Sequence, residues 1–330
     1  MIRSIPFAAA AAAAALFAGT ATAQVKWDMP TPYADREVLT KNTVQFADDV
    51  RRASNGQLVI TMHTAQSLFK NPEIKRAVQT GQVALGEIFK ANLGNEDPIY
   101  ELDAIPFFAA GYKEARVLLD VSKQAINERM LKQGLRALYM APWPSQMFYT
   151  KKPVKSLADL KGLKMRTYNP QTARLAQLLG VVPTTVQATE IPQAFTTGII
   201  DTMFTAGGTG VTTKAWEYTK YVYDTAAWVP NNIAFVNERA FQALPDNLKK
   251  VVLEQAAVAE NRGWEMSQAE NDLAPKQLVQ NGMILDPISE TFAAELKKIG
   301  EQMLDDWLKK AGPDGKKVID AYYAKLKQQR

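Results

Sequence analysis

Apolar side chains recur along the chain at alternating strand and helical spacings. In chain order, the pattern predicts two strand–helix pairs and a further strand, over residues 25–28, 38–53, 58–62, 71–81 and 83–86. Val38, Phe46 and Val50 lie on one face of the first helix, and Asn71-Pro72 begins the second. Strands and helices in this order predict an α/β fold with parallel strands.

A helix and the strand after it are repeated in the second half of the chain. Segments 73–81 and 190–198 agree at five of nine aligned positions, namely Glu, Ile, Ala, Thr and Gly, and each precedes a short apolar run. A helix that ends in Thr-Gly before a strand is a common unit. Five matches in register nevertheless favour two lobes of similar construction.

Two proline-containing segments predict crossings between these lobes. Pro142 and Pro144 flank Trp143 within the apolar stretch 137–150 and hold the chain extended, and residues 228–232 provide the return. The fold class predicted from these features is α/β, with two lobes, a cleft between them and crossing strands.

One very long helix is predicted over residues 246–281. At about 1.5 Å per residue it spans roughly 40–50 Å, more than the width of one lobe, and Pro275 is expected to kink or break it. Two polar-faced helices follow, over 289–308 and 315–327. We assign residues 24–145 and about 232–260 to lobe I, and residues 146–231 and about 261–330, with the C-terminal helices, to lobe II.

Residues 1–23 have the composition of a secretory signal peptide. Arg3 is followed by an alanine-rich apolar run, and Ala21-Thr22-Ala23 is a small-residue cleavage site before Gln24. Cleavage leaves 330 − 23 = 307 residues. The chain has no cysteine and so no disulfides, and it is long enough to bury two cores without them. We therefore expect an exported, periplasmic protein.

The sequence lacks most of the groups that catalysis needs. His63 is the one histidine, and no pair of His or Cys residues has the spacing of metal ligands. The segment 207–210 lacks the lysine of a phosphate-binding loop, and carboxylate pairs such as Asp305-Asp306 occupy predicted solvated helix faces. The net charge of +5 is spread along the chain, unlike a nucleic-acid-binding stripe. We therefore predict no enzyme, no cofactor and no nucleic-acid partner.

Residues 157–180 carry the strongest candidate chemistry. A short strand, 162–166, ends in Arg166, and Asn169 then caps a helix that begins at Pro170. A guanidinium beside the start of a helix suits a carboxylate ligand. Alternatively, Arg166 is a surface charge or half of a structural ion pair.

The same stretch carries a resemblance to a known family. Its motif Asp-Leu-Lys-Gly-Leu-Lys-Met-Arg, residues 159–166, occurs together with Ala141-Pro142-Trp143, with the segment 194–201, and with Pro230-Asn231-Asn232 before the long helix. Over nearly all of the chain after residue 23, the sequence resembles the solute-binding proteins of tripartite ATP-independent periplasmic (TRAP) transporters. The resemblance implies a two-lobed periplasmic solute-binding fold with one long lobe-spanning helix, which closes around its ligand by hinge bending.

The resemblance also implies roles for particular residues. It assigns the ion pair with the ligand carboxylate to Arg166. Some family members bind a metal through a Glu-Trp pair that this chain lacks, so no metal is expected. Thr205 stands where many members have an asparagine, and we expect its hydroxyl and that of Thr209, with the backbone N–H groups of Gly207 and Gly208, to bind an anion or a hydroxyl group. An ordinary turn after a strand is the alternative.

Residues in loops and at strand ends are predicted to line the cleft, namely Tyr33, Phe89, Trp143, Gln146, Phe148, Tyr168 and Trp216. If three or more of the aromatic residues touch the ligand, the ligand carries a ring or an apolar body. Otherwise a small hydroxy- or dicarboxylate is expected, and Lys90 and Arg174 are the nearest candidates for the second cation that a dicarboxylate needs.

The prediction is a monomeric extracytoplasmic binding protein that captures an organic acid anion by lobe closure. It would deliver this ligand to the membrane permease subunits of a TRAP transporter. Two alternatives stay open: an exported hydrolase that uses carboxylates on a bilobal scaffold, and a sensory subunit that passes the ligand to a receptor.

Overall fold

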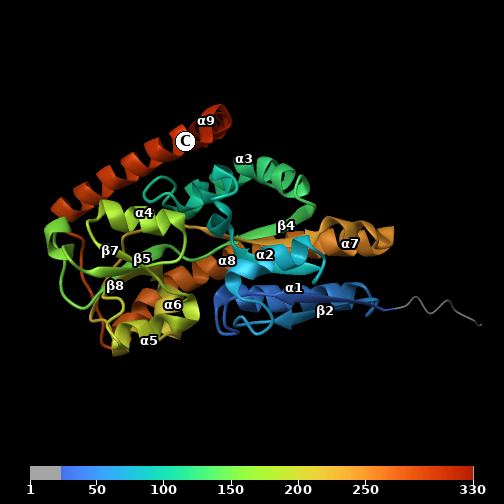
Figure 1. The fold of residues 1–330 in the computed structure, drawn as a ribbon, viewed down its shortest axis with the longest axis horizontal. Coiled ribbons are helices and arrows are strands. Elements are labelled where there is room, and N and C mark those ends of the chain that lie inside the picture. Colours follow the sequence, from blue (N-terminus) through green and yellow to red (C-terminus); the bar gives the residue numbers. More distant parts are fainter. Residues whose placement is uncertain (1–23, 330) are drawn as a thin grey trace, which may run out of the picture.

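The computed structural model describes residues 24–329, which form two α/β lobes arranged end to end along the long axis of the molecule (Figure 1). The elements of the first lobe are β1 (Val25–Pro30), α1 (Val38–Ala53), β2 (Leu58–His63), α2 (Asn71–Gln79), β3 (Leu85–Phe89), the 3₁₀ helices η1 (Lys90–Leu93) and η2 (Pro98–Ala104), α3 (Tyr112–Leu131), β4 (Leu135–Pro142), β10 (Asn231–Asn237) and α7 (Glu238–Gln242). The predicted signal peptide, residues 1–23, lies outside the described residues.

The elements of the second lobe are β5 (Gln146–Thr150), η3 (Leu157–Leu160), β6 (Lys164–Thr167), α4 (Pro170–Leu178), β7 (Val182–Thr185), η4 (Ala188–Glu190), α5 (Ile191–Thr196), β8 (Thr202–Ala206), α6 (Gly207–Thr212), η5 (Ala215–Glu217), β9 (Tyr221–Tyr223) and β11 (Ile284–Leu285). Two long helices, α8 (Asp246–Gln280) and α9 (Glu290–Gln328), contact both lobes. None of the helices in residues 24–329 combines the length and apolarity that crossing a membrane requires.

The sheets mix parallel and antiparallel pairs. In the first lobe β1 pairs with β2 in parallel, and β10 lies antiparallel between β3 and β4. In the second lobe the strand order is β11-β9-β5-β8-β6-β7, in which β5 runs antiparallel to its neighbours β8 and β9. The prediction of parallel strands therefore holds for β1–β2 and β6–β8 but not for the strands that enter after a crossing, because those arrive from the other lobe in the opposite direction.

Strand β5 shows how one strand serves two cores. Met147 and Tyr149 point to a core of the second lobe, whereas Phe148 stacks on Phe204 at a ring-centroid distance of 4.6 Å in the core on the other face. Successive side chains on a strand point to opposite faces, so a continuously apolar segment is buried on both sides. The continuous burial of β5 thus follows directly from its position in the middle of the sheet.

The repeated segment has the same local geometry in both lobes. Gly81 after α2 and Gly198 after α5 adopt left-handed conformations, with φ of +76° and +70°. The next residue donates its N–H back into the helix in each case, Gln82 to Ala77 O at 2.9 Å and Ile199 to Ala194 O at 2.8 Å. This helix ending requires a positive φ, which glycine adopts without strain. The sequence repeat therefore reflects a repeated helix–turn–strand unit.

The two predicted crossings run side by side and are hydrogen-bonded to each other. The N–H of Trp143 donates to Pro230 O at 2.8 Å, and that of Gln146 donates to Trp228 O at 3.1 Å. The first crossing is made of two strands, β4 and β5, rather than one, since Pro142 and Pro144 interrupt the pairing between them. Paired crossings of this kind restrict how the two lobes can move relative to each other.

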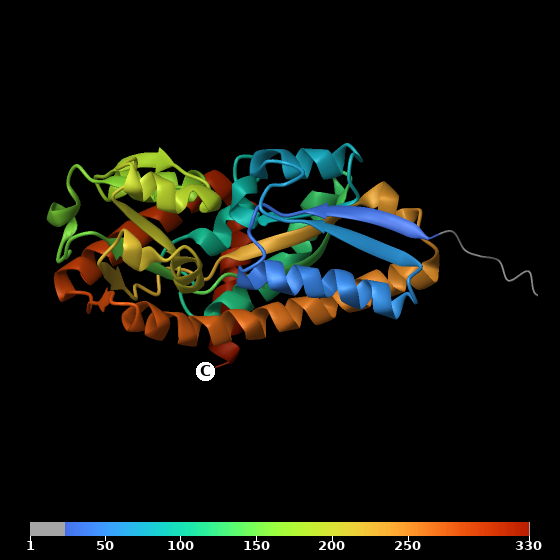
Figure 2. The ribbon, with the colours of Figure 1, turned by 90° about the horizontal axis from the view of Figure 1, so that it is seen from below.

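The long helices agree with the prediction except at Pro275. Helix α8 continues through Pro275 to Gln280, and Figure 2 shows it running beneath both lobes. The expected break at Pro275 is wrong, because Ala274 and Leu278 are buried against the second lobe and hold the helix in place. The stretch labelled α9 is interrupted at Gly312, whose φ of +60° and ψ of −150° are not helical, so the prediction of two successive helices over 289–308 and 315–327 is confirmed. Its residues contact elements of both lobes.

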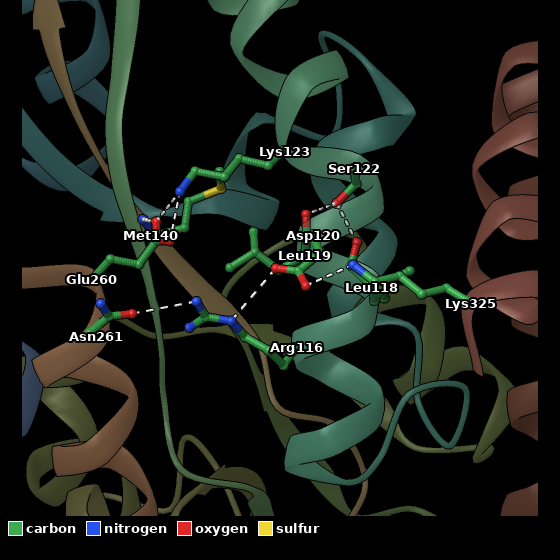
Figure 3. Close-up of polar contacts among 10 residues, drawn as sticks. All are labelled: Arg116, Leu118, Leu119, Asp120, Ser122, Lys123, Met140, Glu260, Asn261 and Lys325. Carbon is green, nitrogen blue, oxygen red and sulfur yellow. Dashed lines mark hydrogen bonds and ion pairs between the residues drawn. The ribbon is translucent and has the colours of Figure 1, made fainter. Parts of the chain in front are cut away.

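Figure 3 shows a polar cluster that fixes α8 against the first lobe. The buried carboxylate of Glu260 on α8 accepts hydrogen bonds from Lys123 Nζ on α3, at 2.6 and 2.7 Å, and from the N–H of Met140 on β4, at 3.1 Å. Asp120 on α3 pairs with Lys325 near the end of α9 at 2.9 Å. Glu260 therefore links the long helix to the strand that crosses into the second lobe.

We predict that Glu260→Ala lowers the free energy of unfolding by about 2–4 kcal/mol, because it leaves the buried Met140 N–H without an acceptor and removes the partner of Lys123. Glu260→Gln, which keeps an acceptor for Met140, should cost clearly less. Urea unfolding measures both, with the exposed Glu254→Ala on the same helix as a control expected to change stability by less than about 0.5 kcal/mol. Equal effects of Glu260→Ala and Glu254→Ala would contradict the linking role.

Candidate functional site

A cavity lies between the two lobes, where the crossings begin. The first lobe contributes Pro32, Tyr33, Glu37, Gln66, Asn71, Phe89, Asn92 and Trp143, and the second lobe contributes Gln146, Arg166, Tyr168, Gln187, Ala188, Thr205, Ala206 and Thr209. A wider hollow between α2 and α4 adjoins it and shares Asn71, Asn92, Tyr168 and Gln187. Side chains of these four residues therefore separate the cavity from the outer surface.

Arg166 is the cationic residue of this lining. It lies on β6 and is 5% exposed, its Nε donates to Val186 O at 3.0 Å, and its guanidinium lies 4.5 Å from the ring centroid of Tyr168. Within residues 24–329, its Nη1 and Nη2 have no hydrogen-bond acceptor and it forms no ion pair. Burial lowers the pKa of Arg166 from its usual value, but a guanidinium remains charged in proteins. Two fixed, unpaired donors are thus available to a ligand carboxylate.

The local structure around Arg166 is the one that its sequence predicts. Asn169 Oδ1 accepts from the N–H of Thr172 at 2.8 Å, Pro170 is the first residue of α4, and β6 ends at Thr167. Since β6 lies between β7 and β8 in the sheet, the backbone of Arg166 is held on both sides. The alternative of a surface charge or a structural ion pair for Arg166 is wrong.

Four aromatic residues form the walls of the cavity. Tyr33 meets Trp143 edge-on, with ring centroids 4.9 Å apart, and Phe89 meets Tyr168 in the same way across the two lobes at 5.7 Å. These walls come from the loop after β1, the crossing, and the ends of β3 and β6. A cavity with four aromatic walls fits a ligand with a ring or an apolar body.

Four of the residues predicted to contact the ligand or line the cleft do not reach the cavity. Gly207 and Gly208 begin α6, and a Cβ at these positions would lie 2.9 Å from Ala274 Cβ and 2.1 Å from the Glu270 carboxylate of α8. The structure thus gives both glycines a packing role, the close approach of α6 to α8. Trp216 packs against the core of the second lobe. Phe148, the fourth candidate outside the cavity, is fully buried in the core.

The other polar candidates line the cavity. Thr205, at the end of β8, and Thr209, in α6, are both buried there, and Gln146 donates its Nε2 to Pro144 O at 2.8 Å. Lys90 and Arg174 do not line it: Lys90 pairs with buried Asp103 at 3.1 Å, and Arg174 pairs with Asp306 of α9 at 2.7 Å. Among the described residues, Arg166 is therefore the one cation in the lining, and a second cation for a dicarboxylate is absent there.

Several polar residues of the lining are not among the predicted site residues. Asn71 begins α2 as predicted, with Lys70 at the N-cap position, and its Nδ2 donates to Gln187 Oε1 of the other lobe at 3.0 Å. Gln66 Nε2 reaches Thr189 Oγ1 across the cleft at 3.3 Å. These contacts join residues more than 100 positions apart in the chain, and local sequence carries no signal for them.

Glu37, which was also not predicted, lies directly before the predicted helix 38–53. It occupies the N-cap position of α1 without a capping hydrogen bond, and its carboxylate instead accepts from Thr209 Oγ1 at 3.2 Å and Thr212 Oγ1 at 2.6 Å across the cleft. Burial raises the pKa of Glu37, and the two hydroxyl donors oppose that rise. Three sets of hydrogen bonds thus bridge the lobes, so the structure is the closed arrangement.

A second buried carboxylate supports two of the walls from behind. Glu87 on β3 accepts from Thr31 Oγ1 at 2.9 Å, in the loop that carries Tyr33, and from Asn232 Nδ2 at 3.2 Å. Asn232 Oδ1 in turn accepts from Trp143 Nε1 at 2.8 Å. Burial raises the pKa of Glu87 from 4.5 to about 7. Glu87 thus orders the residues behind Tyr33 and Trp143 through hydrogen bonds to Thr31 and Asn232.

The chain matches known proteins over most of its length. The model of a family described as bacterial extracellular solute-binding protein, family 7 (DctP), matches residues 31–310. The chain is similar to the crystal structure of DctP7, a Bordetella pertussis extracytoplasmic solute receptor binding pyroglutamic acid, with 45% identity, a TM-score of 0.89 and coverage of 91% of this chain and 99% of that one.

Two further relatives agree with this match. A TRAP solute-binding protein from a marine metagenome, specific for pyroglutamate and solved with co-purified pyroglutamate, has 38% identity, a TM-score of 0.89 and coverage of 92% of this chain and 99% of that one. A solute-binding protein of Sulfitobacter sp. (strain NAS-14.1) is 23% identical over 87% of this chain and 92% of its own length.

The raised pKa of Glu87 predicts a pH-dependent effect of Glu87→Gln. Between pH 4.5 and about 7 the folded protein keeps a proton on Glu87 that the unfolded chain has released, so this group lowers wild-type stability as pH rises. At 1.36 kcal/mol per pKa unit, the loss amounts to about 3 kcal/mol above pH 7. The unfolding free energy of the variant minus that of wild type should therefore increase by up to that amount between pH 4.5 and 8.

Urea titrations at both pH values measure this difference, and the exposed Glu254→Gln serves as the control. A difference that does not change with pH would contradict the raised pKa of Glu87.

Proposed function

This chain belongs to the bacterial extracellular solute-binding proteins of family 7, and on that premise we propose that it captures pyroglutamate, the cyclic lactam of glutamate. It is a solute receptor of the TRAP type, which binds small organic acids and delivers them to membrane permease subunits. Its role is binding, not catalysis, and neither the hydrolase nor the sensory alternative is favoured.

The observation that carries the proposal is the buried Arg166 with two unpaired guanidinium nitrogens in an aromatic cavity. A monocarboxylate with a small ring matches one cation and four ring walls. The two relatives that share 45% and 38% of their residues with this chain both bind pyroglutamate. In this proposal Arg166 pairs with the ligand carboxylate, Tyr33, Phe89, Trp143 and Tyr168 enclose the ring, and Gln146, Thr205 and Thr209 provide polar contacts.

Lobe closure is the step that strengthens this contact. An ion pair that is weak in water becomes stronger when closure removes solvent, and a guanidinium binds a carboxylate through two parallel hydrogen bonds. The backbone of Arg166 is held by two neighbouring strands and its Nε by Val186 O. Little side-chain freedom is therefore left to lose when the ligand arrives.

The family acts outside the cytoplasm, and we propose that this chain reaches that compartment through cleavage before Gln24 and works there as a monomer. We also propose the lobe boundaries expected from the sequence, with α9 counted in lobe II although its end lies against α3 of the first lobe.

We predict that the exported protein begins at Gln24. Intact-mass analysis of protein recovered from the periplasm should give the mass of residues 24–330. A retained residue 1–23 segment in exported protein would contradict the cleavage.

The ligand itself is tested by mass spectrometry of gently purified protein, followed by calorimetry with L-pyroglutamate. We expect pyroglutamate to be recovered unchanged and to bind tightly to the ligand-free protein. Recovery of a different acid, with no heat on addition of pyroglutamate, would overturn this ligand.

The same calorimetry tests Arg166. Removing one partner of a buried charged contact costs about 2–5 kcal/mol, or roughly 30- to several-thousand-fold in affinity, so Arg166→Ala should nearly abolish binding. Arg166→Lys should not fully restore it, because an ammonium lacks the planar fork. Arg174→Ala is the matched control, since Arg174 pairs with Asp306 away from the cavity. Unchanged affinity in Arg166→Ala would remove Arg166 from the site.

A further inference from the structure

The polar groups that line the cavity differ in how fully they are already bonded. Asn71 bonds to Gln187, Asn92 Nδ2 lies 3.4 Å from Asn71 Oδ1, and Gln146 bonds to Pro144 O. These amides largely satisfy one another. Among the described residues, the groups with capacity left over include Arg166, with its two free nitrogens, the acceptors Glu37 and Asn92, and the hydroxyls of Tyr33 and Thr205.

Glu37 has more unused capacity than its two hydrogen bonds suggest. An ionised carboxylate has about four lone-pair positions, and Thr209 and Thr212 occupy two of them. Its side chain is buried and, within the part of the chain that the structure describes, it forms no ion pair. A buried carboxylate without a cation is costly unless further donors reach it. The hydroxyls of Thr209 and Thr212 already point to Glu37, and a ligand bound in the cavity can bring a further donor to it.

The helix end and the hydroxyl groups around Glu37 stabilise its charge and fix its position in the cavity. It stands at the N-cap of α1, where the positive end of the helix favours a negative charge. Its two hydroxyl partners come from α6 of the opposite lobe, so the carboxylate takes up this place when the lobes are closed. Glu270 of α8 lies behind α6, against Gly208, and does not line the cavity.

From this geometry we infer that Glu37 is a specificity-determining residue, which accepts a hydrogen bond from a ring N–H of the ligand while Arg166 binds the ligand carboxylate. This inference rests on the proposed function and extends it. The site then requires one carboxylate and one donor in the same small ring. It also disfavours a dicarboxylate, because the second negative charge would enter a closed cavity that already holds Glu37 and only one cation.

A pair of isosteric ligands isolates this contact. L-Pyroglutamate and 5-oxotetrahydrofuran-2-carboxylate have the same ring and carboxylate, but the second has an oxygen in place of the N–H. A site built around a donor rejects an analogue that lacks it, because its own acceptor is left buried and unpaired. We expect wild type to prefer the lactam by about 100-fold or more in calorimetry.

The variant Glu37→Gln should collapse that preference to below about 10-fold, because its amide can turn an N–H toward the ring oxygen. Any effect of the substitution on folding or lobe closure acts on both ligands alike and cancels in the ratio of their dissociation constants. Glu270→Gln makes the same chemical change at the neighbouring carboxylate outside the cavity and should keep the full preference.

Asn92→Ala tests the rival acceptor, whose Oδ1 is buried without a partner in the described residues. The inference is overturned if wild type binds both ligands equally, if Glu37→Gln keeps the full preference, or if the preference disappears in Asn92→Ala and persists in Glu37→Gln. Failure of the proposed function has a different signature, since wild type would then not bind pyroglutamate at all; that result removes the inference too.

Discussion

The interior of this protein is arranged around a positive charge that has no internal counter-ion. Arg166 is buried between the lobes, yet only its Nε has a protein acceptor among the described residues. Burying a guanidinium in this state is unfavourable, and its pKa is lowered accordingly. The structure tolerates the cost because β6 sits within a six-stranded sheet and the ring of Tyr168 lies against the guanidinium. A ligand carboxylate removes that cost, which makes binding favourable where a surface arginine would gain little.

Two buried carboxylates lie at or behind the cavity, and neither forms an ion pair with Arg166 among the described residues. Glu37 faces the cavity from the first lobe and is bound by hydroxyls of the second. Glu87 lies behind the walls and orders Thr31, Asn232 and, through Asn232, Trp143. Burial raises the pKa of both carboxyl groups, and their hydrogen-bond donors oppose that rise. The polar lining selects among anions, and the aromatic walls select for shape.

Movement between the lobes is limited by three covalent connections and by the packing of one helix. The connections are the crossings around Trp143 and Trp228, hydrogen-bonded to each other, and the helix α8, while α9 packs against elements of both lobes. Glu260 ties α8 to the first lobe, whereas Gly207 and Gly208 let the other half of α8 approach α6 closely. The lobes can therefore close as packed units, and the contacts that bridge the cleft are few and polar: Asn71 with Gln187, Gln66 with Thr189, and Glu37 with the two threonines.

Elements with local causes could be predicted directly from the amino-acid sequence. The helix 38–53 follows from apolar spacing, the start of α4 from Asn169-Pro170, and the glycine endings at Gly81 and Gly198 from their required φ. The sequence also singled out Arg166 and the four aromatic walls, through their place at strand ends and the family motif. Which of the candidate residues come together in the cavity depends on how the two lobes pack. Gly207, Gly208 and Trp216 sit near the site in sequence but pack elsewhere, while Glu37 and Asn71, which look like helix-start residues, reach across to the other lobe. The physical reason is that capping and turn geometry involve neighbours in the chain, whereas a cleft is formed by lobes whose facing residues are up to 175 positions apart.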